Sequence, residues 1–267
     1  MTTDHDVRES AGAFIQALAA TLDDLAESDT QLGSMAVRMA QLDLSAAIRG
    51  PFDKTDHDGL RHLERLTQSM NQAGYHAQTG LGDAINAAIQ HLDWSPVYGG
   101  ADTDHALANG LFTAQAAGNY GGFYSDGISV GLFLLAPHLH YPFHTHEAAE
   151  VYYCLAGQVE VQQGVRGQAR LLEPGDHSFT PPNRLHALTT GDEPALLAYS
   201  WHGDLHCETW WWAVQPDGSY RRTAWRRDPG QSWRPHQSEV VSEQAFAQAH
   251  GTIDPRLLDS DLPVIPG

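Results

Sequence analysis

The chain has 267 residues, of which 42% are hydrophobic and 18% charged, and its formal net charge is −18. This composition supports one large domain, or a domain with an extension, around a buried core, and it excludes wholesale disorder. The excess of acidic residues repels phosphate backbones and anionic membrane surfaces, so we expect neither a nucleic-acid nor a membrane partner. With two cysteines, no signal-peptide pattern in the first residues and no apolar run of about 18 residues, the sequence predicts a cytoplasmic protein.

The first hundred residues are expected to be helical. Phe14, Leu18, Leu22 and Leu25 recur at spacings of three and four, which places them on one face of a helix. Asp58 is a candidate N-cap for a later helix. The predicted helices cover about residues 7–27, 31–48, 58–70 and 82–92, and residues 93–104, with a Pro and two Gly, are expected to be a linker.

Short runs rich in β-branched and aromatic residues follow, from about residue 111 to residue 214, separated by Gly, Pro and Asp. Many short strands at this spacing predict an antiparallel sandwich or barrel, so the fold is expected to be mainly β. Residues 1–100 are expected to form a helical region packing on the barrel, 105–215 the barrel itself, and 216–267 a C-terminal extension with a short helix at 242–250. The predicted strands are 121–124, 129–136, 149–156, 158–163, 168–172, 177–180, 186–190, 195–201 and 210–213.

A cluster of residue types that bind metals lies at positions 144–150. His144 and His146 share a face if they lie in one strand, and Glu150 has the same parity, so it joins them if the strand continues or bends gently. Two imidazoles and a carboxylate that converge in this way suit a divalent first-row transition metal. Gly157 then permits a turn into the next strand.

A second block supplies another candidate ligand. Gly175 is followed after five residues by Pro181, Pro182 and Asn183, a strong turn signal, and His186 begins the next apolar strand. A barrel would bring this histidine beside the first three ligands, which leaves coordination positions for water or substrate. The expected cofactor is one divalent transition metal ion: Fe, Mn, Zn, Co or Ni.

Two tyrosines accompany these candidate ligands. Tyr152 lies two residues after Glu150, hence on the same inward face, and Tyr141 lies three residues before His144. A phenol has an ordinary pKa of about 10, but a nearby cation favours the phenolate, which is a competent general base. The alternative is that both rings pack as ordinary core residues with their hydroxyls hydrogen-bonded.

The two blocks resemble the two cupin motifs. The first block matches His-x-His, three residues, Glu, six residues, Gly throughout, although His138 stands where a glycine usually precedes the first histidine. In the second block Asn183 stands for a glycine and Thr190 for the last asparagine, and these departures touch turn geometry rather than ligands. The resemblance covers about residues 137–190. It implies a cupin antiparallel β-barrel, a double-stranded β-helix or jelly roll, preceded by the helical region.

The pattern Tyr-Pro-Phe-His-x-His-x-x-x-Glu-x-Tyr resembles, more narrowly, the cupin dimethylsulfoniopropionate (DMSP) lyases of the Ddd group. The resemblance implies a carbon–sulfur lyase that cleaves DMSP, a small zwitterionic carboxylate, by β-elimination to dimethyl sulfide and acrylate. It makes Tyr152 the general base that removes the Cα proton, and Tyr141 a second active-site tyrosine. The metal ligands that it implies are His144, His146, Glu150 and His186.

The sulfonium group of such a substrate needs aromatic faces, because a cation that donates no hydrogen bonds is best held over ring systems. In the run Trp210–Trp212, alternation places the first and third rings on one face and the middle ring on the other, so at least one is expected to be ordinary packing. The candidate substrate-binding residues are Tyr141, Phe143, Tyr199, Trp201 and these three tryptophans.

Two other functions stay open at this point. One is another small-molecule cupin enzyme, such as an Fe(II) dioxygenase, although oxygen chemistry does not demand the pair Tyr141 and Tyr152. The other is a non-catalytic, metal-dependent sensor or binding cupin, but residues 1–100 hold few Lys or Arg and no basic recognition helix. The helical region could cap the barrel mouth, gate the substrate or form a homodimer interface, and these alternatives stay open too.

Overall fold

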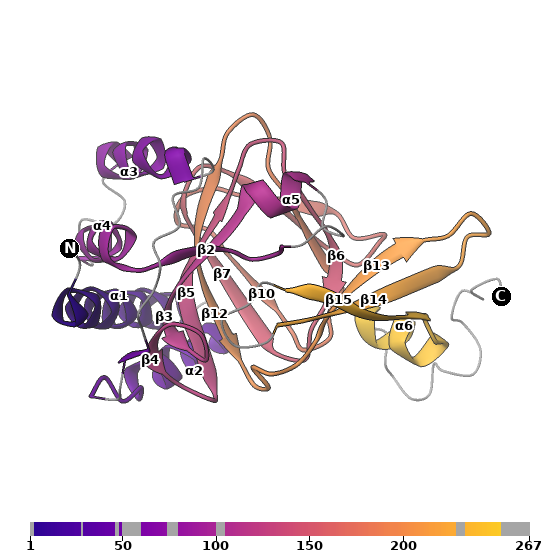
Figure 1. Cartoon of the computed structure of the whole chain (residues 1–267), viewed down its shortest axis with the longest axis horizontal. Coiled ribbons are helices and arrows are strands. Elements are labelled where there is room, and N and C mark those ends of the chain that lie inside the picture. The colour runs from indigo at the N-terminus through magenta and orange to yellow at the C-terminus, as the bar shows by residue number, and fades with distance from the viewer. Residues whose placement is uncertain are drawn as a thin grey trace.

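Two β-sheets packed face to face make up the centre of the molecule, with helices beside them (Figure 1). The computed structural model describes residues 3–27, 29–45, 48–49, 60–73, 80–99, 105–227 and 233–251. Within these residues the first sheet runs in the order β1 (Ile48–Arg49), β4 (Gly122–Tyr124), β3 (Leu111–Gly118), β5 (Ile128–Leu135), β12 (Ala195–His202), β7 (Ala149–Ala156) and β10 (His177–Thr180), with β2 (Trp94–Pro96) beside β3.

The second sheet lies opposite the first. Among the described strands, pairing is antiparallel in both sheets except between β3 and β4. This arrangement confirms the mainly β, two-sheet fold that the motifs predicted. The second sheet runs in the order β15 (Arg234–Val240), β14 (Tyr220–Arg226), β13 (Thr209–Val214), β6 (His140–Thr145), β11 (His186–Thr189), β8 (Val159–Gln163) and β9 (Ala169–Leu172).

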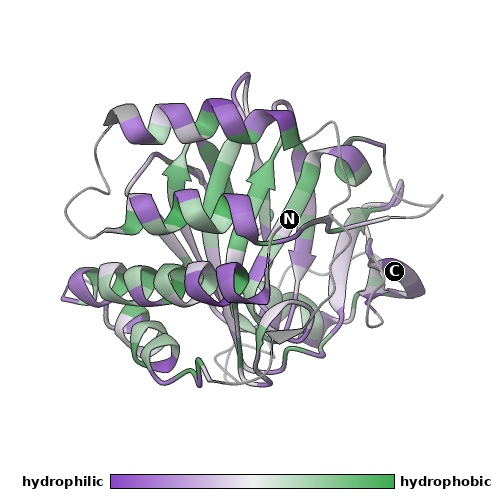
Figure 2. Cartoon of the chain, turned by 60° about the vertical axis from the view of Figure 1, so that its left-hand side comes forward, coloured by the Kyte–Doolittle hydropathy of each residue, from purple (hydrophilic) through white to green (hydrophobic). Residues whose placement is uncertain are grey.

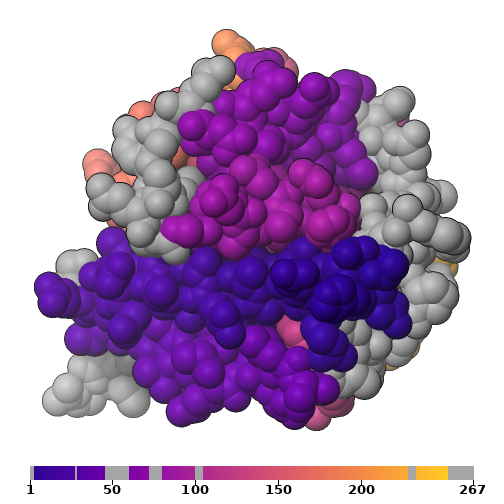
Figure 3. Space-filling view, turned by 90° about the vertical axis from the view of Figure 1, so that its left-hand side faces the viewer, coloured from indigo at the N-terminus to yellow at the C-terminus, as the bar shows by residue number. Residues whose placement is uncertain are grey.

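A layer of helices covers the outer face of the first sheet (Figures 2 and 3). The stripe predicted in the first helix accounts for this packing, because Phe14, Leu18 and Leu22 are fully buried in one cluster with apolar residues of the sheet. In the part of the chain that the structure describes, none of the helices is both long enough and apolar enough to cross a membrane. The layer consists of α1 (Asp4–Leu25), α2 (Thr30–Ala40), α3 (Arg61–Ala73) and α4 (Leu81–His91).

Some element boundaries differ from the expectation. The second helix ends at Ala40 rather than near residue 48, because Ile48 and Arg49 pair with β4 as β1. Asp58, the expected N-cap, lies outside the described residues. The expected linker contains β2, and a short helix α5 (His105–Gly110) follows it.

The predicted strands missed β1, β2, β3, β6, β14 and β15. Because β14 and β15 extend the second sheet from β13, this sheet continues past residue 215, where the C-terminal extension was expected to begin. The helix expected at 242–250 is confirmed as α6 (Glu243–His250). The division into domains otherwise stays a prediction.

Alternate residues of the central strands face either the helices or the space between the sheets, as strand geometry requires. On β7, Val151 and Leu155 belong to the cluster shared with the helices, which we call the helix-side core. Tyr152 and Cys154 belong to the cluster between the sheets, which we call the inner core. The inner core is where the candidate ligands meet.

Candidate metal centre and adjoining cavity

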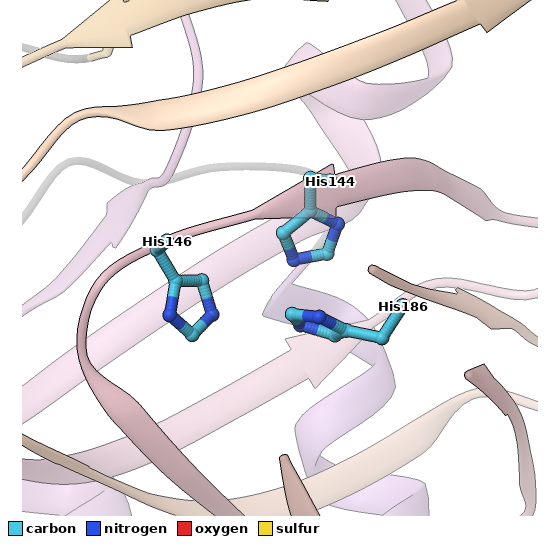
Figure 4. A group of neighbouring side chains, drawn as sticks. All are labelled: His144, His146 and His186. Atoms are coloured by element: carbon cyan, nitrogen blue, oxygen red, sulfur yellow. The ribbon is translucent and has the colours of Figure 1, made fainter. Parts of the chain in front are cut away.

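Three histidines converge in the space between the sheets (Figure 4). His144 lies on β6, His146 follows in the next loop, and His186 begins β11, the antiparallel neighbour of β6. One ring nitrogen of each histidine lies within 4.8 Å of the others, and all three side chains are buried. Within the described residues, this group is capable of binding a metal ion.

A hydrogen bond to the backbone sets the orientation of each imidazole. Because a carbonyl oxygen only accepts, the Nδ1 atom of each ring carries the hydrogen and the Nε2 atom keeps its lone pair. Metal-binding histidines use this arrangement, in which the protein holds the second ring nitrogen. The Nδ1 atoms donate to the carbonyls of Pro142 (from His144, 2.8 Å), Ala148 (from His146, 2.8 Å) and Arg184 (from His186, 2.9 Å).

Glu150 reaches the histidines from β7 in the opposite sheet. Its Oε2 atom lies 3.1 Å from Nε2 of His186 and 3.4 Å from Nε2 of His146, and its Oε1 atom accepts a hydrogen bond from the indole N–H of Trp201. Because the two Nε2 atoms carry lone pairs, each of these contacts places one hydrogen-bond acceptor against another, without a hydrogen between them. All three atoms are buried and have no hydrogen-bond partner within the described residues. A cation among them would satisfy all three, so the residues fit a divalent metal.

A continuous strand is not what brings His144, His146 and Glu150 together. β6 ends at Thr145 in the second sheet, and β7 begins at Ala149 in the first. The chain therefore crosses the space between the sheets within a few residues. The carboxylate faces the imidazoles across that space instead of lying beside them on one strand.

A β-bulge makes Tyr141 and His144 face the same way although they are three residues apart. His186 pairs with His144 and Leu188 with Tyr141, so a step of three residues on β6 lies opposite a step of two residues on β11, and the register shifts by one residue between the pairs. The ring of Tyr141 consequently stacks on His144, with ring centroids 4.0 Å apart and planes at 23°.

The three departures from the cupin motifs lie in turns, as expected. His138 and Asn183 have φ angles of 56° and 60°, in the left-handed region that glycine adopts freely and asparagine tolerates. Thr190 fastens the turn at His138, because its hydroxyl donates to the carbonyl of Ala136 (2.6 Å) and accepts from the amide of Leu139 (2.9 Å). None of the three supplies a candidate ligand atom, although the backbone amide of Asn183 donates to the carbonyl of His146 (2.7 Å).

A cavity adjoins the metal centre along the inner face of the first sheet. Glu150 and Arg227 are the charged residues of its lining, and the rest is aromatic, aliphatic or neutral polar. The guanidinium of Arg227 lies over the ring of Tyr120, 4.3 Å from its centroid. The residues predicted from the sequence that line the cavity are Tyr141, Tyr152, Tyr199 and Trp201, and the structure adds Phe133 and Trp233.

The structure places the other predicted aromatic residues away from this cavity. Phe143 and Trp212 pack in a separate cluster with α6, and Trp210 lies under the Arg222 guanidinium, 4.2 Å from ring centroid to Cζ. Trp211 packs instead against the inner core, on the opposite face of β13 from Trp212. The expected division of the tryptophan run between two faces is therefore confirmed.

Tyr152 is the next inward-facing residue of β7 after Glu150, and it is almost fully buried. Burial, followed by the charge of the Glu150 carboxylate and a hydrogen bond to it, raises the pKa of Tyr152 well above its ordinary value. Its ring stacks on Phe133, with centroids 5.7 Å apart. The phenol of the metal-free protein is therefore neutral, and it ionises only where positive charge is brought close.

Tyr98 and Arg227 are site residues that the sequence did not single out. The hydroxyl of Tyr98 lies 2.5 Å from that of Tyr141 and accepts a hydrogen bond from the indole N–H of Trp211 (3.0 Å). Tyr98 lies in the expected linker, and its backbone forms an isolated parallel β-bridge with Trp233. The sequence signal that could have identified Tyr98 as a core residue is the adjacent pair of large apolar residues Val97 and Tyr98. Both are buried in the structure.

Gly131 makes room for Tyr199 in the cavity wall. A Cβ atom at Gly131 would collide with the carbonyl oxygen of Ala114 and lie 2.9 Å from the hydroxyl of Tyr199. The ring of Tyr199 therefore lies across β5, where its hydroxyl accepts a hydrogen bond from Thr113 at 3.3 Å.

Comparison with known proteins gives concordant results. Residues 57–197, more than half of the chain, match the profile of the dimethylsulfoniopropionate lyase family. The chain is 34% identical over 130 residues to the DMSP lyase DddQ of Ruegeria pomeroyi, an alignment that covers 48% of this chain and 64% of that relative, slightly under two thirds of its length. The crystal structure of DddQ from R. pomeroyi matches with a TM-score of 0.54 and 27% identity, over 72% of this chain and 92% of that one.

Proposed function

The chain belongs to the dimethylsulfoniopropionate lyase family, and from this premise we propose that it cleaves DMSP by β-elimination to dimethyl sulfide and acrylate. The observation that carries the proposal is the buried set His144, His146, His186 and Glu150, with Tyr152 next to the carboxylate. A divalent metal held by these groups would draw electron density from a substrate carboxylate, acidify the adjacent Cα–H and favour the Tyr152 phenolate.

Tyr152 is the proposed general base. As phenolate it takes the proton from the carbon next to the carboxylate, and the electron pair of that C–H bond forms the carbon–carbon double bond of acrylate. The C–S bond breaks, and its electron pair leaves with sulfur as neutral dimethyl sulfide. No acid is required on the sulfur side, because a sulfonium departs as a neutral molecule.

Tyr141 is the proposed donor to the substrate carboxylate. The indole of Trp211 donates to Tyr98, and a phenol that accepts a hydrogen bond becomes a better donor itself, because hydrogen bonds in a chain polarise one another. Tyr98 then donates to the oxygen of Tyr141, which directs the Tyr141 proton into the cavity. The arrangement holds one O–H donor beside the metal centre.

The aromatic section of the cavity is the proposed place of the sulfonium. Phe133, Tyr199, Trp201 and Trp233 offer ring surfaces there, and such surfaces attract cations. Arg227 repels a sulfonium from its own part of the cavity, so the substrate's positive end is confined to the rings.

Headspace chromatography of metal-loaded protein incubated with DMSP tests the activity. Dimethyl sulfide and acrylate are expected in equal amounts, and Glu150→Ala is expected to lose bound metal and product formation together. Glu147→Ala, which removes an exposed carboxylate three residues earlier, is the matched control and keeps both. The absence of dimethyl sulfide with every metal tested would refute the proposal.

The same incubation separates the rival functions. A dioxygenase consumes O₂, which an oxygen electrode records, whereas elimination consumes none. A sensor cupin would bind metal and ligand without turnover. The cytoplasmic location, the absence of a nucleic-acid partner and the homodimer interface of the helical region stay predictions.

A further inference from the structure

The turn that carries His186 is fastened by the end of α6. The amide of Leu185 donates to the carbonyl of Ala249 (2.9 Å), and the guanidinium of Arg184 donates to the carbonyl of His250 (2.9 Å). Both acceptors belong to the last turn of α6, whose carbonyls have no partner within the helix itself. The positive charge of Arg184 also suits the negative end of the helix dipole.

The same turn holds two of the candidate ligands. The carbonyl of Arg184 accepts the Nδ1 hydrogen of His186 (2.9 Å), and the amide of Asn183 donates to the carbonyl of His146 (2.7 Å). A shift of the backbone at 183–185 therefore turns the His186 ring and moves the segment that carries His146. The orientation of both imidazoles depends on this turn.

α6 is itself firmly docked. Phe246 stacks on His250 with centroids 4.0 Å apart and packs in one cluster with Leu185 and Trp212. The Nδ1 atom of His250 donates to the carbonyl of Phe246 (2.8 Å), which leaves Nε2 to accept from the amide of Val165 (3.4 Å). α6 lies outside residues 57–197, the segment that matches the family profile.

Gly251 closes the helix and makes room for Arg184. It has a φ of 67°, and a Cβ atom there would collide with the Arg184 guanidinium. A side chain at Gly251 would therefore displace Arg184 from the helix end.

We propose that α6 is the positioning element of the metal centre, with Arg184 as the positioning residue that joins its last turn to the backbone of His186. The proposal rests on the proposed metal site. It assigns the C-terminal extension a role in metal affinity, through the Arg184 carbonyl that aims His186, and not in the reaction itself.

Cobalt binding tests this role. The variants are Arg184→Ala, Gly251→Ala and their combination, and the control is Gly218→Ala, which has a comparable φ of 85° but no atom within 4 Å of the added Cβ. Co²⁺ affinity is measured by competition with a chelator, the coordination geometry by visible absorption, and the fold by the thermal midpoint of the metal-free protein. Loss of a group that supports a ligand typically lowers metal affinity about 10- to 100-fold.

We expect Arg184→Ala and Gly251→Ala each to lose Co²⁺ affinity by this factor. The thermal midpoint of each metal-free variant should be no lower than that of the Gly218→Ala control. The double variant should bind no more weakly than the weaker single one, because both changes remove the same contact. Wild-type affinity in both single variants, or an equal loss in Gly218→Ala, overturns the proposal.

If the alanine variants unfold, Arg184→Lys decides, since it keeps the cation but not the guanidinium geometry. An altered Co²⁺ spectrum with weaker binding supports the proposal, and unchanged binding overturns it. Failure of the wild-type protein to bind Co²⁺ would instead refute the metal centre, and with it the proposed function.

Discussion

The two faces of β7 belong to different environments although their residues alternate along one strand. Toward the helices, Val151 and Leu155 pack with aliphatic residues of α1 to α4 in the helix-side core. Toward the second sheet, Glu150 and Tyr152 meet histidines and aromatic rings. There the Oε2 atom of Glu150 and the Nε2 atoms of His146 and His186 lack hydrogen-bond partners within the described residues. One face is saturated by apolar contacts, and the other keeps polar atoms unsatisfied.

Stability and ligand binding are divided between the two faces of this sheet. Apolar burial in the helix-side core lowers the free energy of the folded chain by roughly 25 cal/mol per Å². Unsatisfied buried polar atoms in the inner core raise that free energy. The helix layer therefore stabilises a sheet whose other face is organised for binding, and substitutions on the two faces should have separable effects.

The largest expected effect is that of Tyr152→Phe on turnover. Removal of a general base typically lowers kcat by about 10²- to 10⁴-fold, while the ligands and hence the metal content are retained. The matched control is Tyr153→Phe, which deletes a hydroxyl from the helix side of the same strand and should leave kcat within about twofold. Initial rates of dimethyl sulfide release, with metal analysis, measure both, and near-normal turnover of Tyr152→Phe would remove it as the base.

Leu155→Ala should show the opposite pattern. Leu155 is 1% exposed in the helix-side core, and such a truncation costs about 2–5 kcal/mol of unfolding free energy. Urea unfolding should record the loss, whereas kcat of the folded, metal-loaded fraction stays at the wild-type value. A fall in kcat as large as that in stability would contradict the separation of the two faces.

A smaller effect is expected from Tyr98→Phe, because Tyr98 acts through Tyr141. The change leaves the Trp211 indole and the Tyr141 oxygen without their partner, which costs about 1–3 kcal/mol of stability, and we expect kcat to fall roughly tenfold. If Tyr141 donates to the substrate and is polarised by this chain of hydrogen bonds, kcat of Tyr141→Phe should fall further than kcat of Tyr98→Phe. The double variant should then lose no more kcat than Tyr141→Phe alone. Steady-state kinetics of the three variants decide the point.

The smallest effect concerns the stability of the metal-free protein against acid. Burial, followed by the neighbouring His186 and His146, holds the pKa of His144 well below 6.5. Between the folded pKa and 6.5 the unfolded chain therefore binds the additional proton, and stability falls as pH drops below 6.5. Thermal midpoints measured from pH 8 to pH 4 should decline, and His144→Asn should flatten the first part of the decline.

The sequence was enough to single out the candidate ligands on the first motif, because their spacing is local, but it did not predict how they converge. His144, His146 and Glu150 were found by parity along one expected strand, yet the chain crosses between the sheets before Glu150. Tyr152 was found because it shares β7 with Glu150.

Tyr98 was missed for a different reason. It lies among Pro and Gly residues that locally indicate a linker, and its place is fixed by partners distant in sequence, Tyr141, Trp211 and Trp233. β14 and β15 were missed similarly, because their alternation of Arg, Trp and polar residues is weak and their order comes from pairing with β13. Contacts of this kind leave no periodic signal.

Gly131 sets the width of the cavity at this wall, because the ring of Tyr199 packs directly against it. A methyl group at position 131 would meet the carbonyl oxygen of Ala114 at 2.4 Å and the Tyr199 ring at 2.8 Å, so it would disturb the pairing of β3 with β5 as well as displace the ring. A smaller residue at position 199 would instead widen the cavity without touching the backbone. The volume available to the alkyl groups of the proposed substrate is therefore set at this wall by one side chain, apart from the residues proposed to take part in the elimination.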